Sequence, residues 1–298
     1  MTTDRLAPAT TVGRLVDDLA RTLAARGIAE PISEAREIVA AIYDVPRFWP
    51  LVNGEVGVDA STSQRAERAA AKRAQGAPLA YAVGRASFRH LTLDVDERVL
   101  IPRPETEQLV ELVLEELAGT TGGVAIDVGT GSGAIAIALA AEGRFSRVYG
   151  TDVSRDAIDV ARENVRLSSA VLRAPVEMLH GSLLGPLLDV RARVVVSNPP
   201  YIAVGEAAAL PDSVRDWEPG VALFSGSDGM AATARLVRES ADVLAPGGLF
   251  ALEVDARRAS VAAELVLRER RFRSVRIELD LTGRERFVLA RRQEKNFG

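Results

Sequence analysis

Residues 124–140 read VAIDVGTGSGAIAIALA, and this stretch decides the fold. Its first five residues form a short, mostly apolar run, which is typical of a buried strand. Three glycines follow, Gly129, Gly131 and Gly133, and then an apolar run long enough for a helix. A buried strand, a glycine turn and a helix predict the first unit of a parallel α/β sheet whose loop approaches a ligand closely.

The same alternation of strands and helices continues toward the carboxyl terminus. Strands are predicted over residues 124–128, 147–152, 175–179, 192–197 and 249–254. Helices are predicted over residues 133–142, 155–167, 229–244 and 256–270. This rhythm indicates an α/β fold with a doubly wound parallel sheet, and residues 272–279 and 285–292 add a terminal β-hairpin.

The chain before this sheet has a different character. Residues 11–26, 33–43 and 63–75 place apolar or alanine residues at helical spacing. Short β-type runs between 86 and 101 predict a hairpin, and Pro104 suits the first turn of the helix that follows. We expect a small all-helical N-terminal domain over 1–84 that docks the substrate, a hairpin linker over 85–100 and a catalytic domain over 101–298.

The composition argues against several functional classes. The 298 residues carry 37 basic and 41 acidic side chains, a formal net charge of −4, which disfavours a protein that coats nucleic acid. The absence of cysteine excludes thiolate metal sites, and His90 and His180 alone cannot build a histidine-rich one. The sequence has neither a leader pattern at its start nor a membrane-length apolar run. We therefore expect a cytoplasmic protein without a bound metal.

The glycine loop and two acidic residues indicate a nucleoside ligand. The spacing G-x-G-x-G lacks the extra residue of the dinucleotide fingerprint and the lysine of a P-loop, which disfavours NAD and ATP. Asp152 ends the second predicted strand, where a carboxylate can accept hydrogen bonds from both ribose hydroxyls. Asp127 is costly to bury without a partner, and a ligand ammonium would be one. An amino-acid group beside Asp127, joined to a ribose beside Asp152, describes S-adenosylmethionine.

These residues also have structural interpretations. The glycine loop alone could be a tight turn that binds nothing. Asp152 could cap the helix that follows it, but Ser154 or Asp156 could fill that capping role instead. We therefore favour ribose binding for Asp152.

A second motif follows the predicted strand 192–197. Asn198, Pro199, Pro200 and Tyr201 stand at its carboxyl end, where ligands bind in open α/β sheets. The Asn198 side-chain oxygen and the Pro199 carbonyl can together accept both hydrogens of a planar amino group, on which Tyr201 can stack. Such acceptors favour methyl transfer to a weakly nucleophilic nitrogen without requiring a general base. A proline-rich turn is the structural alternative, which the glycine loop and Asp152 make less favourable.

The motifs together resemble those of the HemK/PrmC protein-(glutamine-N5) methyltransferases, a family with the class I S-adenosylmethionine-dependent fold. The matching stretches are GAPLAYAVG (76–84), VLIPRPETE (99–107), DVGTGSG (127–133), SNPPYI (197–202), DWEP (216–219), DGM (228–230) and DLTGRERFVLA (280–290). The resemblance implies a helical N-terminal domain, a hairpin linker and a Rossmann-like, seven-stranded catalytic domain. It also implies methylation of the glutamine side-chain nitrogen in the Gly-Gly-Gln motif of peptide chain release factors.

The resemblance also assigns roles to single residues. Asn198, Pro199 and Tyr201 are the expected catalytic residues, and Arg103 and Glu105 are expected to shape the amide pocket. A surface charge and a helix N-terminal carboxylate are the alternatives for the last two. The expected substrate-binding set is Asn198, Pro199, Pro200, Tyr201, Arg103 and Glu105. The expected set for S-adenosylmethionine is Asp127, Gly129, Thr130, Gly131, Gly133, Asp152, Val153, Ser182, Leu183 and Asn198.

Three stretches depart from the family pattern. Ser182 stands where the family usually has an acidic residue near the adenine amino group, and a hydroxyl accepts more weakly than a carboxylate. Asp255 follows Glu253 and Val254, where the family usually has glycine. AAIYDVPRFW (40–49) replaces a leucine-rich segment that contains glycine. These differences bear on cofactor affinity and substrate identity more than on the fold.

Two other functions stay open from the sequence. The enzyme could methylate another target, either a ribosomal-protein glutamine or an amino group in nucleic acid. Alternatively, the chain could be a non-catalytic relative that acts as an interaction module. The acidic balance disfavours nucleic acid. The resemblance makes release factors the expected partner, and we expect a monomer. Trp217, in the connection after Tyr201, is either a lid over the substrate or a loop anchor.

Overall fold

The computed structural model describes residues 10–225 and 230–294, and the chain divides into two compact units. One unit comprises Met1–Arg85 with Pro211–Trp217, and the other comprises Ala86–Leu210 with Glu218–Gly298. The sequence predicted contiguous domains, so the grouping of Pro211–Trp217 with the N-terminal residues differs from that prediction. Asp228 and Gly229 of the DGM motif lie outside the described residues.

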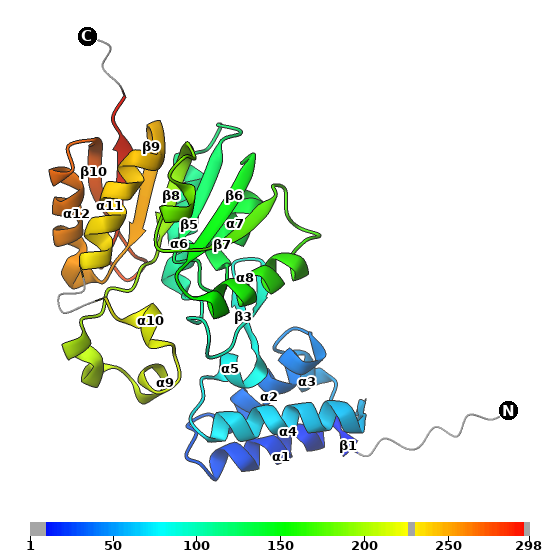
Figure 1. The fold of residues 1–298 in the computed structure, drawn as a ribbon. Coiled ribbons are helices and arrows are strands. Elements are labelled where there is room, and N and C mark those ends of the chain that lie inside the picture. The colour runs from blue at the N-terminus through cyan, green and yellow to red at the C-terminus, as the bar shows by residue number, and fades with distance from the viewer. Residues whose placement is uncertain (1–9, 226–229, 295–298) are drawn as a thin grey trace. The chain divides into compact units, whose positions relative to one another are not determined.

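The first unit is built mainly from helices, as the sequence predicts. They are α1 (Val12–Ala24), α2 (Pro31–Tyr43), α3 (Trp49–Val52), α4 (Ala60–Ala74) and α5 (Leu79–Val83), drawn in blue to cyan in Figure 1. The side chains of Thr11 and Asp59 cap α1 and α4, and Pro31 opens α2. Apolar faces of these helices form one core, which includes Leu15, Leu19, Leu23, Ile38 and Val39.

This unit contains two features that the sequence did not predict. A short antiparallel pair joins β1 (Thr10–Thr11) to β2 (Gly57–Val58), so the unit is not entirely helical. The divergent stretch 40–49 ends α2 with Asp44 in the left-handed conformation and sets the Tyr43 and Trp49 rings 5.3 Å apart.

A hairpin precedes the main sheet, within the predicted stretch. It consists of β3 (Arg85–Phe88) and β4 (Leu91–Asp94), which pair in a two-stranded sheet. The Arg89 guanidinium binds the Glu142 carboxylate at 2.6 and 2.7 Å and that of Glu111 at 2.6 Å. Glu111 lies on α6 (Pro104–Glu116) and Glu142 on α7 (Ala134–Glu142), so one arginine ties the hairpin turn to two helices.

The second unit contains a seven-stranded sheet in the order β10-β11-β9-β8-β5-β6-β7. Its strands are β5 (Val124–Val128), β6 (Arg147–Asp152), β7 (Val176–His180), β8 (Ala192–Ser197), β9 (Leu244–Glu253), β10 (Phe272–Leu279) and β11 (Glu285–Arg292). Strands β5 to β9 run parallel, and β11 runs antiparallel to both β9 and β10. This arrangement confirms the predicted parallel sheet with a terminal hairpin (Figure 1).

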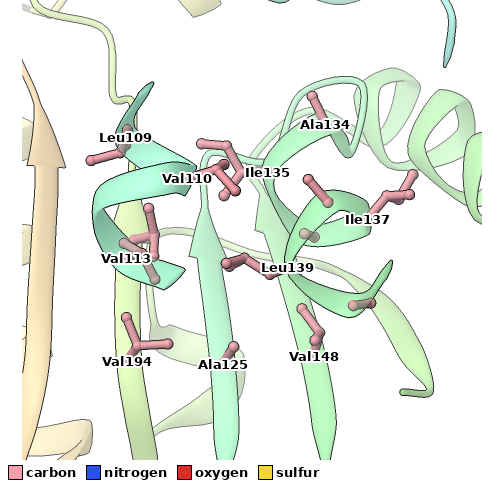
Figure 2. Close-up of a cluster of buried hydrophobic side chains, with 14 of the residues drawn as sticks. Leu109, Val110, Val113, Ala125, Ala134, Ile135, Ile137, Leu139, Val148 and Val194 are labelled. Carbon is pink, nitrogen blue, oxygen red and sulfur yellow. The ribbon is translucent and has the colours of Figure 1, made fainter. Parts of the chain in front are cut away.

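Helices cover both faces of the sheet. α6, α7 and α8 (Arg155–Leu167) contribute to one apolar cluster, and α11 (Ala231–Val243) and α12 (Ala259–Arg268) contribute to the other. In β5, Ala125 belongs to the first cluster, whereas Ile126 and Val128 belong to the second. Figure 2 shows side chains of α6 and α7 packed against residues of the sheet, among them Ala125, Val148 and Val194. Alternate residues of the central strand therefore fill both cores.

In the described ranges, short helices lie in the connections that follow β7, β8 and β9. They are η1 (Gly185–Leu187), η2 (Val204–Ala209), α9 (Asp212–Arg215), α10 (Gly220–Leu223) and η3 (Ala256–Arg258). β5 is the point at which the strand order reverses, because β6 and β7 extend on one side and β8 and β9 on the other. Such a reversal opens a crevice at the carboxyl ends of the strands. Across the described ranges, no helix is long and apolar enough to cross a membrane.

Candidate active site

A cavity of about 520 Å³ lies at the carboxyl ends of the central strands. Val128 of β5 pairs with Thr151 of β6 and with Ser197 of β8, so the residues that end or follow these strands meet at one edge. Nine predicted residues line the cavity: Gly129, Gly131, Asp152, Val153, Ser182, Leu183, Asn198, Pro199 and Pro200. Six do not, namely Arg103, Glu105, Asp127, Thr130, Gly133 and Tyr201. The volume is in the usual range of small-ligand sites, about 300–1,000 Å³.

The first two glycines of the loop expose backbone to the cavity. Gly129 and Gly131 have φ values of 74° and 53°, and a Cβ atom at either position would meet no atom within 4 Å. Gly133 differs, because a Cβ there would stand 3.1 Å from the Ile137 side chain and 3.2 Å from that of Met178. The third glycine therefore serves helix and strand packing, while the first two leave room for a ligand.

Asp127, which we expected to contact a ligand ammonium, faces the protein interior and does not line the cavity. The side chain is fully buried, and its Oδ2 accepts hydrogen bonds from the Thr130 hydroxyl at 2.6 Å and the Ala136 N–H at 3.1 Å. Burial raises the pKa of Asp127 to about 7. Asp127 and Thr130 thus hold the loop and the start of α7 from behind. Within the described part of the chain, Asp127 Oδ1 has no hydrogen-bond partner.

Asp152 holds the glycine loop at its cavity side. Its Oδ2 accepts the Gly131 N–H at 3.0 Å and its Oδ1 accepts the Ser154 N–H at 2.9 Å. Ser154, not Asp152, caps α8 by accepting the Ala157 N–H, so the capping alternative for Asp152 does not apply. Burial raises the pKa of Asp152 above its ordinary value. Each carboxylate oxygen retains a lone pair for a hydroxyl donor.

The far end of the cavity contains a cation that the sequence did not reveal. Arg235 of α11 lines the cavity and donates to the Ser182 hydroxyl at 3.2 Å. Glu239 accepts from Arg235 at 2.6 Å and from the Leu184 N–H at 3.0 Å. The spacing of Arg235 and Glu239 predicts an ion pair on one helix face, but not that this face borders a cavity. Arg98, Val99 and Leu100, from the predicted linker, also line the cavity.

Asn198 enters a line of buried polar side chains. Its Nδ2 donates to the Thr106 hydroxyl at 3.0 Å, and this hydroxyl donates to Glu253 at 2.7 Å. Thr106 is 5% exposed and Glu253 is 1% exposed. Tyr201 is half-buried beside this line, and burial, with the nearby Glu253 charge, raises the pKa of its phenol to about 12. Thr106 was not a predicted site residue, although it lies within the 99–107 motif, directly after the predicted Glu105.

Arg103 and Glu105 do not line the cavity. The Arg103 guanidinium binds both oxygens of Glu218, at 2.6 and 2.7 Å, and the Glu218 side chain is 1% exposed. This pair joins the 99–107 motif to the DWEP motif. Trp217 belongs to the first unit, where its indole nitrogen lies 3.6 Å from the Cβ position of Gly76. Within residues 10–225 and 230–294, no group of three or more acidic or histidine side chains could hold a metal ion.

Family models match both parts of the chain. The model described as "PrmC N-terminal domain" matches residues 14–84, and that described as "Methyltransferase small domain" matches residues 105–210. The solved structure of a methyltransferase from Pyrococcus furiosus has the same fold, with a TM-score of 0.50 at 20% identity, over 68% of this chain and 88% of that one.

Curated relatives cover nearly the whole chain. A protein of Moorella thermoacetica named release factor glutamine methyltransferase is 37% identical over 285 residues, which span 96% of this chain and 100% of the relative. A protein of Deinococcus radiodurans with the same name is 39% identical over 89% of this chain and 93% of the relative. The chain therefore belongs to the release factor glutamine methyltransferase family.

Proposed function

We propose that this protein uses S-adenosylmethionine to methylate the side-chain nitrogen of the glutamine in the Gly-Gly-Gln motif of peptide chain release factors. The observation that carries this proposal is that Asp152, the glycine loop and Asn198 line one cavity. A nucleoside site and an amide acceptor are thereby close enough to serve one reaction. The names of the curated relatives indicate the substrate.

The residues of the cavity fit the cofactor. Gly129 and Gly131 offer backbone in left-handed conformations with open space in front, suited to the methionine part. Asp152 offers carboxylate lone pairs to the ribose hydroxyls, and Val153 and Leu183 offer apolar surface to the adenine. When bound, S-adenosylmethionine supplies an electrophilic methyl group.

Asn198 and Pro199 orient the amide that receives the methyl group. The Asn198 Oδ1 and the Pro199 carbonyl accept the two hydrogens of the glutamine side-chain nitrogen. As that nitrogen becomes positively charged, the two acceptors stabilise it more strongly than in the ground state, which lowers the barrier. A buried Pro199 fixes its carbonyl in place, because the proline ring restricts the backbone.

The helical unit has the complementary role of docking the release factor, as we propose for residues 1–84. This docking domain, the linker over 85–100 and the catalytic domain over 101–298 act as a monomer in the cytoplasm. Nucleic acid is contacted by the release factor and not by this protein. The other target classes and the non-catalytic function considered from the sequence are not favoured, because the curated relatives carry one enzyme name.

The test is incubation of the purified protein with labelled S-adenosylmethionine and the release factors of its own organism, followed by peptide mass mapping. We expect one methyl group on the glutamine of Gly-Gly-Gln. A release factor with Gln replaced by Ala in that motif is the matched control and should accept no label. Label on another residue or on a ribosomal protein would contradict the proposed substrate.

A further inference from the structure

The amide of Asn198 has two possible orientations, and only one of them suits the proposed reaction. A rotation of 180° about the last side-chain bond exchanges Oδ1, which accepts hydrogen bonds, with Nδ2, which donates them. A target –NH2 group needs the acceptor. The orientation therefore has to be fixed by neighbours of Asn198 that can distinguish its oxygen from its nitrogen.

Thr106 and Glu253 provide this distinction. An ionised carboxylate only accepts hydrogen bonds, so the single hydroxyl proton of Thr106 is directed to Glu253 Oε2, at 2.7 Å. The Thr106 oxygen is then left as an acceptor toward Asn198, and the Asn198 Nδ2 donates to it at 3.0 Å. Both hydrogen bonds are therefore donated toward Glu253, and Asn198 Oδ1 points away from Thr106.

We propose that Thr106 and Glu253 are positioning residues that hold the Asn198 amide with its oxygen available to the target amide. This role rests on the proposed function. The two residues come from different elements, Thr106 from the first turn of α6 and Glu253 from the end of β9. Both are almost fully buried, so water does not compete for their hydrogen bonds.

Protonation of Glu253 would allow the donors and acceptors of these two hydrogen bonds to exchange roles. Burial raises the pKa of Glu253 to about 7, and Glu105 raises it further, whereas the Thr106 hydrogen bond, Arg286 and Arg103 lower it. The phenol of Tyr201 also faces this carboxylate and is influenced by it. A protonated Glu253 can donate to Thr106, which then donates to Asn198 Oδ1 after the amide rotates. Asn198 Oδ1 then accepts from the Thr106 hydroxyl and is no longer available to the target amide. The rate of methyl transfer should therefore fall as the pH drops through about 7.

Three variants test this role by methyl transfer to a release factor. Thr106→Val keeps the shape but removes the hydroxyl, and we expect kcat to fall about 10- to 100-fold with an unchanged Kd for S-adenosylmethionine. Thr106→Ser keeps the hydroxyl and should stay within about 3-fold of the wild type. Glu253→Gln can donate to Thr106 at every pH, so it should lose kcat and also lose the acidic limb of the pH profile.

Thr233→Val is the matched control, because Thr233 of α11 is fully buried and its hydroxyl has no hydrogen-bond partner among the residues that the structure describes. It should match the wild type in kcat and in pH profile. Thermal unfolding of each variant shows whether it is folded. A folded Thr106→Val protein with wild-type kcat and an unchanged pH profile would overturn the positioning role.

A second measurement does not depend on the substrate. The side-chain amide signals of Asn198, followed by ¹⁵N NMR, should shift with a midpoint near pH 7 in the wild type and lose that shift in Thr106→Val. If no release factor is methylated, the proposed function fails, while this titration still decides whether Glu253 and Thr106 control the amide. Asn198 signals that do not respond to pH or to Thr106→Val would overturn the inference by themselves.

Discussion

The two ends of the cavity are built in different ways. At the cofactor end, Gly129 and Gly131 follow one strand and Asp152 ends its neighbour, so short sequence motifs and strand register create most of the geometry. At the amide end, Asn198 is held by Thr106, which lies 92 residues earlier in the chain. The cofactor end therefore depends on backbone conformation, and the amide end depends on side chains that the whole fold brings together.

Asn198→Ala is the change that should separate the two ends most strongly. It removes the amide acceptor without touching the glycine loop or Asp152, so we expect kcat to fall about 100- to 1,000-fold, as for the loss of a transition-state hydrogen bond. The Kd of S-adenosylmethionine, measured by calorimetry, should stay within about 2-fold of the wild type. Retained turnover would sink the amide-binding role of Asn198.

The sequence could predict that the glycine loop and Asp152 lie at one edge of the sheet because the determinants of this arrangement are local. A strand, a glycine turn and a helix are adjacent in the chain, and the carboxyl ends of parallel strands share one edge of the sheet. The motif at Asn198 and Pro199 was found by the same reasoning. Local pattern also predicted the parallel sheet and its terminal hairpin, although β9 begins at Leu244, before the predicted start at 249.

The residues that hold Asn198 in place could not be predicted from local sequence patterns. Within the 99–107 motif, the charged Arg103 and Glu105 drew attention, but Thr106 is the residue that reaches Asn198. Which side of α6 faces Asn198 is set by packing of the apolar residues of this helix, and no pairing at a separation of 92 or 115 residues is visible in one sequence. The burial of Asp127 behind its own loop was not predictable either, because a carboxylate that holds the loop has the same sequence signature as one that binds a ligand.

Arg103→Ala tests the ion pair between Arg103 and Glu218, which joins residues 115 positions apart in the chain. The change leaves the Glu218 carboxylate buried without its cation, and burial already raises the pKa of Glu218 above its ordinary value. We expect a loss of about 3 kcal/mol in the free energy of unfolding, measured in urea. Arg268→Ala breaks an exposed pair with Glu264 and should cost less than about 1 kcal/mol. Equal losses in both variants would show that Glu218 does not need Arg103.

Gly131→Ala should weaken cofactor binding and leave kcat nearly unchanged, whereas Asn198→Ala should lower kcat and leave cofactor binding nearly unchanged. The new Cβ would point into the open space in front of the loop, at a φ of 53° that costs an alanine about 1–2 kcal/mol. We expect the Kd of S-adenosylmethionine to rise about 10-fold, while kcat at saturating cofactor changes little.

Gly119→Ala is the matched control for the glycine loop. Gly119 has a φ of 76°, and a Cβ there would also meet no atom within 4 Å, but it does not line the cavity. The same backbone strain should therefore lower stability without changing the Kd of the cofactor. A parallel loss of affinity in both variants would mean that general destabilisation, and not the space before Gly131, explains the result.

Arg235→Ala should have the smallest effect, and it tests whether the cofactor end is built by backbone alone. The Arg235 side chain is 51% exposed and is anchored by Glu239, so its guanidinium stands at the cavity wall beside Ser182. Adenine ring nitrogens accept hydrogen bonds, so a guanidinium at this wall can donate to them. We expect the Kd of S-adenosylhomocysteine to rise about 3-fold, with Arg268→Ala as the control that removes a similarly paired helix arginine. An unchanged Kd would mean that the apolar surface of Val153 and Leu183 suffices for the base, and that Arg235 serves only to hold α11 against the loop at Ser182.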